Sequence, residues 1–192
     1  MNKANYLYID NGHGVDTKGK RSPVWKDGTQ LFEWEYNRRL VADIVELLKD
    51  TNITPIIVVP EVNDISLSER VDRVNKAARF HASDNNLFLS VHGNAGGGTG
   101  WECFTANQCS EKSVRFAKML SDRFSQMFPN EKNRGCKKEN FFVIKHTCCP
   151  AVLTENFFFD NETDCKKMID KDFRHSIAEV HAISIKDYFD SL

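Results

Sequence analysis

Two kinds of apolar pattern alternate along this chain, one typical of strands and one typical of helices. Residues 56–59 are a continuous run of β-branched side chains, and residues 87–91 form a second apolar run, as expected of strands buried on both faces. Residues 33–49 instead repeat apolar side chains at helical spacing. The alternation predicts a single α/β layered domain over residues 1–192, in which helices flank a central, mostly parallel or mixed β-sheet.

The other elements follow from the same periodicities and from residues that start or stop helices. Ser66, with Glu69 three residues later, has the pattern of a capping box, and Pro129 ends another helical pattern. Residues 15–30 have no sustained period and are expected to form an exposed, mobile loop. We predict further strands at residues 6–10, 141–144 and 151–154, and further helices starting after Ser66, at residues 110–128 and at residues 172–189.

Charge and cysteine content exclude several classes of protein. The net charge of −1 provides no overall basic field, so we expect no nucleic-acid partner. Residues 1–10 contain an apolar run too short for a signal peptide or a membrane span, which predicts synthesis in the cytoplasm without a recognisable signal peptide and no stable membrane association. The six cysteines are scattered, and two are adjacent, which favours reduced thiols over a disulfide framework.

Two histidines and a glutamate are candidate metal ligands. His13 and His92 each follow a predicted strand in a glycine-flanked loop, and Glu33 lies at the start of a predicted helix. A hydrolytic zinc ion needs three nitrogen or oxygen ligands and one open position for water. Taken singly, each histidine is better explained as a loop or hydrogen-bonding residue, and the glutamate as a helix-capping residue. Spacing alone does not decide whether the three residues converge.

Motifs spread along nearly the whole chain resemble those of the zinc-dependent N-acetylmuramoyl-L-alanine amidases of bacterial autolysins and phage endolysins (amidase type 3). Residues 90–95, which contain His92, are the most distinctive of them. The other matching segments are residues 9–14, 32–37, 67–70 with Asn75, 133–135 and 150–157.

This resemblance implies one Zn²⁺ ion held by His13, Glu33 and His92. It favours Glu33 over Glu35 as the ligand because the family pattern places the ligand four residues before the asparagine that is Asn37 here. It also implies that Glu155 is the catalytic residue, which takes a proton from water and passes it to the leaving amine. The implied reaction is hydrolysis of the amide between N-acetylmuramic acid and L-alanine in peptidoglycan, which releases stem peptides.

The sequence suggests two substrate-binding residues and leaves rival functions open. Asn94 follows the second histidine motif, and Arg21 belongs to a basic loop whose alternative role is that of a solvated charged surface. A zinc peptidase or deacylase would use the same metal and glutamate, and a catalytically silent wall-binding domain would keep the fold. For the amidase, action on the cell wall after release through a separate holin-type pore is expected. The sequence does not predict an oligomeric state.

Overall fold

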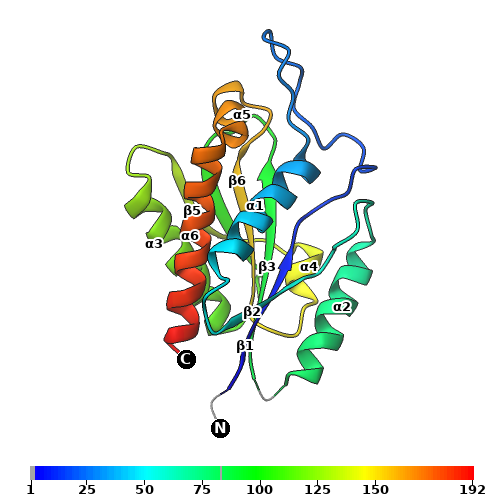
Figure 1. The fold of residues 1–192 in the computed structure, drawn as a ribbon, viewed down its shortest axis with the longest axis vertical. Helices are drawn as coiled ribbons and strands as arrows, with labels where there is room; N and C mark the ends of the chain where they lie inside the picture. Colours follow the sequence, from blue (N-terminus) through cyan, green and yellow to red (C-terminus); the bar gives the residue numbers. More distant parts are fainter. Residues whose placement is uncertain (1–2, 83) are drawn as a thin grey trace.

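A six-stranded sheet forms the centre of the computed structural model, which describes residues 3–82 and 84–192 (Figure 1). The spatial order is β2-β1-β3-β6-β4-β5. The first four strands in this order are parallel, β4 is antiparallel to β6, and β5 is parallel to β4. The strands are β1 (Asn5–Asp10), β2 (Ile53–Ile57), β3 (Asn85–Asn94), β4 (Trp101–Thr105), β5 (Asn133–Lys138) and β6 (Ala151–Phe158). The predicted mixed α/β architecture is confirmed.

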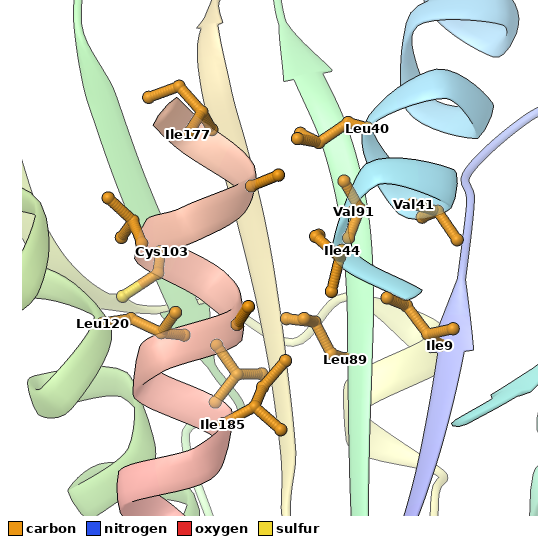
Figure 2. Close-up of a cluster of buried hydrophobic side chains, with 14 of the residues drawn as sticks. Ile9, Leu40, Val41, Ile44, Leu89, Val91, Cys103, Leu120, Ile177 and Ile185 are labelled. Atoms are coloured by element: carbon orange, nitrogen blue, oxygen red, sulfur yellow. The ribbon is translucent and has the colours of Figure 1, made fainter. Parts of the chain in front are cut away.

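Helices cover both faces of the sheet. Helix α6 packs against α1 and α3 on one face, where the larger apolar core lies; Ile44, Leu89 and Ile185 belong to this core (Figure 2). Helices α2 and α4 cover the other face over a smaller core. The helices are α1 (Glu33–Leu47), α2 (Leu67–Phe80), α3 (Glu111–Met127), α4 (Phe142–Lys145), α5 (Glu162–Ile169) and α6 (Lys171–Asp190). Within the described ranges, every helix is too short or too polar to cross a lipid bilayer.

Several helices begin where a polar side chain caps the first turn. The Ser66 hydroxyl accepts a hydrogen bond of 3.1 Å from the backbone N–H of Glu69, so the predicted start of α2 is confirmed. Ser110 caps α3 in the same way, and α3 ends before Pro129. Each such cap stabilises a helix by about 1 kcal/mol. These local signals explain why the predicted helix boundaries agree closely with the structure.

Two predictions are wrong at least in part, and one strand was missed, where a short apolar run was ambiguous or absent. Residues 141–144 were expected to be a strand but lie largely in the single-turn helix α4, because four apolar residues do not distinguish the two structures. The edge strand β5 has a polar sequence without alternation and was not predicted. The strand predicted over residues 56–59 is shifted toward the N-terminus. The observed strand β2 begins at Ile53, ends at Ile57 and contains Pro55, a residue that is tolerated in an edge strand.

The segment at residues 15–30 is a largely exposed loop, as predicted, and backbone hydrogen bonds order the part that leads into α1. Ser22 and Leu31 are buried, and the backbone N–H of Ser22 donates to the Leu31 carbonyl over 2.8 Å. An antiparallel bridge joins Arg21 to Phe32, and the Glu33 N–H donates to the Lys20 carbonyl over 3.0 Å. This segment therefore returns to the start of α1 and satisfies a backbone donor there, which the helix cannot satisfy itself.

Candidate active site

A cavity opens at the carboxyl ends of β1, β3 and β6, on the face that α2 and α4 cover. In open α/β sheets this edge is where ligands usually bind. Charged and polar side chains line its sheet side, and apolar side chains from α2 and from the segment around α4 form a wall. The lining residues are Asp10, Gly12, His13, Lys20, Asp64, Leu67, Arg70, His92, Phe141, Phe142, Val143, Leu153 and Glu155.

His13, Glu33 and His92 converge at the floor of this cavity. One nitrogen or oxygen atom from each lies within 4.8 Å of the atoms from the other two. The Glu33 Oε1 atom is 3.3 Å from His13 Nε2 and 3.1 Å from His92 Nδ1. The three residues that spacing could not join therefore share one site, and in the described part of the chain they form the one cluster of this kind.

Local backbone structure places each of the three side chains. His13 follows β1 in a left-handed conformation (φ 62°), a strained state for a residue with a side chain and one that is commonly found at functional sites. Glu33 is the first residue of α1 and is fully buried. Burial opposes its ionisation, but hydrogen bonds with His13 and His92 outweigh this effect and hold the pKa of Glu33 below its usual range. Glu35 instead points to an ion pair with Arg39 at 2.5 Å.

A chain of hydrogen bonds behind His92 orients its ring. The Ser90 hydroxyl donates to Asp10 Oδ2 over 2.7 Å and lies 3.1 Å from His92 Nε2. Because the single hydroxyl proton of Ser90 goes to the carboxylate, Ser90 accepts from His92, so Nε2 carries a proton. The Nδ1 atom lies 3.1 Å from Glu33 Oε1, and although burial opposes protonation of the ring, the hydrogen bond with Glu33 and the nearby carboxylates outweigh it and raise the pKa of His92.

Asp10 is in turn held by Arg70, and both residues are buried. Arg70 also pairs with Asp64 at 2.6 Å. A buried pair of this kind costs several kcal/mol when one partner is removed, because the other charge is left without compensation. The sequence motifs contained Asp10, Arg70 and Ser90, but no role for these residues was predicted. The only sequence feature that could have indicated a role for them is their position inside the motifs.

Glu155 lies beside His92 across the parallel pair formed by β3 and β6. A bulge follows immediately, where β6 has one residue more than β3 and Phe157 adopts φ 69°. Bulges often occur next to active sites because they redirect side chains. Burial raises the pKa of the Glu155 carboxyl to about 8, against the opposing charge of His92, and its Oε2 atom is buried without a hydrogen-bond partner.

The two predicted substrate-binding residues lie away from this floor. The Asn94 side chain donates to Glu102 over 2.7 Å and accepts from the Ala95 N–H over 2.8 Å, so both ends of its amide are bonded within the protein. Arg21 is exposed, and neither residue is among those that line the cavity. Lys20 does line it, with Nζ 3.5 Å from Glu33 Oε2. The sequence indicated Lys20 only as one of several basic residues in its loop.

Comparison with known proteins matches this geometry to a family. A family profile for N-acetylmuramoyl-L-alanine amidase matches residues 7–187. The chain belongs to the N-acetylmuramoyl-L-alanine amidase family. The N-acetylmuramoyl-L-alanine amidase CwlM of Bacillus licheniformis is 29% identical over 176 residues, which cover 92% of this chain and 65% of CwlM. The endolysin of Bacillus phage SPP1 is 30% identical over 188 residues, which cover 94% of this chain and 65% of the endolysin.

This chain thus spans 65% of the length of each of those two relatives. The family's fold is also seen in a crystal structure of an N-acetylmuramoyl-L-alanine amidase from Clostridium difficile 630. That structure superposes with a TM-score of 0.87 at 24% sequence identity, with 98% of each chain covered. The resemblance inferred from the motifs is confirmed at the level of family and fold.

Proposed function

We propose that this domain is a zinc-dependent N-acetylmuramoyl-L-alanine amidase whose single Zn²⁺ is held by His13, Glu33 and His92. The observation that carries the proposal is the convergence of two imidazoles on one buried carboxylate, beside the carboxyl group of Glu155, whose Oε2 atom is buried without a partner. Two nitrogen ligands and one oxygen ligand are a common set for catalytic zinc, and they leave a coordination position open.

The unsatisfied polar atoms at the site support the fit of a cation. The buried Oε2 atom of Glu33 has no hydrogen-bond partner, and its approach to Lys20 is an ion pair without hydrogen-bond geometry. A buried carboxylate oxygen without a partner is costly unless a cation or a donor satisfies it. The Nε2 proton of His92 is held by Ser90, so Nδ1, which lies 3.1 Å from Glu33 Oε1, is the ring atom that would bind a metal ion once it gives up its proton. Both observations match a divalent ion that prefers nitrogen and oxygen ligands.

Glu155 would move the proton that the reaction requires. When bound, zinc supplies Lewis acidity that activates water and polarises an amide carbonyl. Glu155 would accept a proton from the attacking water and donate it to the amine nitrogen of the departing L-alanine, since amines leave poorly without a proton. A carboxyl group whose pKa lies near the working pH suits both halves of this transfer, and burial keeps Glu155 in that range.

The substrate we propose is the amide between N-acetylmuramic acid and L-alanine in peptidoglycan. The names of the relatives support this choice over a zinc peptidase or deacylase. An intact Glu155 and an intact ligand set argue against a silent wall-binding domain. The apolar wall at Phe141 and Phe142, each more than a third exposed, is the one part of the cavity suited to sugar or peptide stacking. Contacts of Asn94 and Arg21 with substrate stay predictions.

Place of action and domain extent are proposals too. We propose that the protein acts on the cell wall, as the endolysin name of one relative suggests, with release through a holin-type pore as the route. The net charge gives no support to a nucleic-acid partner. The extent of the domain over residues 1–192 stays a prediction, and we assign no oligomeric state.

The test combines metal analysis with product analysis. Purified protein should contain about one zinc ion per chain, and Glu33→Gln should lose most of it, whereas Glu35→Gln, a change at the exposed neighbour, should keep it. Peptidoglycan digested by the wild type should release stem peptides that begin with L-alanine, measured by mass spectrometry. Active protein without any metal would overturn the zinc site. Cleavage within the peptide would reassign the substrate to that of a peptidase.

A further inference from the structure

Two cysteines outside the cavity face each other across the outer strands of the sheet. Cys103 lies on β4 and Cys136 on the edge strand β5, and the two residues are direct partners in the parallel ladder. Their Sγ atoms are 3.4 Å apart. Directly paired residues on neighbouring strands are about 5 Å apart at Cα, which is within the range that a disulfide spans.

The surroundings of the two thiols differ in a way that affects their access. Cys103 is fully buried, next to Leu120 of α3 in the core (Figure 2). Cys136 is exposed as a residue. Both thiols approach the carbonyl oxygen of Ala117, at 3.6 Å for Cys103 and 3.1 Å for Cys136. As a residue, Cys136 is therefore open to solvent, whereas Cys103 is closed to it.

Hydrogen bonds link the two thiols in series, because the Cys136 S–H in turn donates to the Ala117 carbonyl over 3.1 Å. The Cys103 S–H donates to the Cys136 sulfur, and this bond lowers the pKa of the Cys136 thiol to about 7. The same bond, together with burial, raises the pKa of Cys103. The thiolate is the nucleophile in disulfide exchange, so the exposed member of the pair is also the more reactive one.

We propose that Cys103 and Cys136 form a redox-reactive dithiol site that takes small-molecule disulfides such as glutathione disulfide as its oxidant. The Cys136 thiolate attacks one sulfur of the reagent, a mixed disulfide forms, and one glutathione thiol leaves with the proton. The Cys103 thiol, once it gives up its proton, attacks the Cys136 sulfur and displaces the second glutathione thiol. The protein loses two hydrogen atoms, and the reagent is reduced to two thiols.

Formation of this bond would fasten the edge of the sheet close to the active site. Strand β5 is held in the sheet by β4 alone. Glu102, the residue before Cys103, pairs with Arg134 at 2.7 Å and also with Lys137 of β5. Glu102 lies opposite Glu155 in the antiparallel β4–β6 ladder. In residues 3–82 and 84–192, the remaining four cysteines form no second pair with sulfur atoms in contact.

The experiment treats the folded, full-length protein with glutathione disulfide, followed by denaturation, alkylation and peptide mapping by mass spectrometry. The wild type should lose two titratable thiols as a disulfide between the peptides that contain Cys103 and Cys136, and dithiothreitol should restore both. Cys103→Ala should instead accumulate glutathione on Cys136, because the resolving thiol is missing. Cys136→Ser should leave Cys103 unmodified, and Cys148→Ser, a change at an exposed cysteine elsewhere, should behave as the wild type.

Three results would overturn the proposal. One is a stable glutathione adduct on Cys136 in the wild type, which would mean that Cys103 cannot resolve it. Another is the persistence of both thiols under conditions that oxidise a model dithiol peptide. The third is a disulfide that joins either cysteine to a different partner. None of these results depends on amidase activity.

Discussion

A single methyl group at Gly12 should displace one of the proposed zinc ligands. Gly12 precedes His13, with φ 22°, and a Cβ atom built there would lie 2.3 Å from Cε1 and 2.6 Å from Nδ1 of His92. Ordinary contact begins at 3.4 Å, so in Gly12→Ala the imidazole has to move by about 1 Å. The ring cannot move freely, because Glu33 and Ser90 hold its two nitrogens at 3.1 Å each.

The size of this displacement determines the expected loss of zinc affinity. Zinc–nitrogen bonds are about 2.0 to 2.1 Å long and tolerate deviations of about 0.2 Å. A shift of about 1 Å therefore removes His92 as a ligand. Changes that only misorient a ligand weaken metal binding about 10- to 100-fold, so we expect at least the upper end of that range for Gly12→Ala. The overpacked ring should also lower the free energy of unfolding of the metal-free protein by about 1 to 3 kcal/mol.

Gly19→Ala is the matched control for this substitution. Gly19 also has a positive φ, of 77°, but a Cβ atom there meets nothing within 4 Å. It therefore introduces the backbone strain without the clash. Zinc affinity is measured by competition with a chromogenic chelator, together with thermal unfolding with and without zinc. If the zinc affinity of Gly12→Ala is within about threefold of that of Gly19→Ala, the assignment of His92 as a zinc ligand is wrong.

Three further predictions concern the base, the metal and a buried histidine. Glu155→Gln should lower kcat by about 10² to 10⁴-fold and leave zinc content unchanged; equal loss of both would make Glu155 a structural residue. Chelation should abolish peptidoglycan hydrolysis and lower the unfolding temperature, and added zinc should restore both, as followed by turbidity and calorimetry. Burial lowers the pKa of His181 from 6.5 to about 4, so the unfolded state binds more protons between these values and stability should fall by up to about 3 kcal/mol as pH decreases through that window. Urea unfolding of the chelated protein should show this slope, and His181→Gln should lack it.

Much of this fold could be predicted because its elements carry local signals. The apolar run at residues 87–91, which lies within β3, and the cap at Ser66 each reflect a local preference that the tertiary structure does not override. The helix at residues 142–145 and the strand at residues 133–138 lack such signals. One is a single turn, and the other is polar because it is an edge strand whose pairing with β4 is a long-range event.

In the candidate site, too, only the residues that carry a local sequence signal could be predicted. His13, Glu33 and His92 could be selected from the sequence because they lie in motifs at predicted strand ends or at a helix start, although His92 lies within β3 and not in the loop predicted after it. Only the fold shows that the three residues meet. The residues that orient His92 through hydrogen bonds and an ion pair, which are Ser90, Asp10 and Arg70, were not predicted as site residues. The path from His92 through Ser90 to Asp10 joins residues from β3 and β1, and it depends on the parallel register that places Ser90 beside Asp10. Hydrogen bonds across strands have no signature in the spacing of a sequence.

The carboxyl groups of Glu33 and Glu155 have the same chemistry, but their surroundings give them different pKa values. Glu33 has two imidazoles within 3.3 Å and Lys20 at 3.5 Å, and these contacts keep its pKa low in spite of burial. Glu155 is only partly buried as a residue, but its Oε2 atom is buried without a partner, and burial raises the pKa of this carboxyl group to about 8. A ligand must stay ionised, whereas a proton carrier must change its charge near neutral pH. From these environments we infer the ligand role for Glu33 and the proton-transfer role for Glu155, and an exchange of the two roles would require the imidazoles to move.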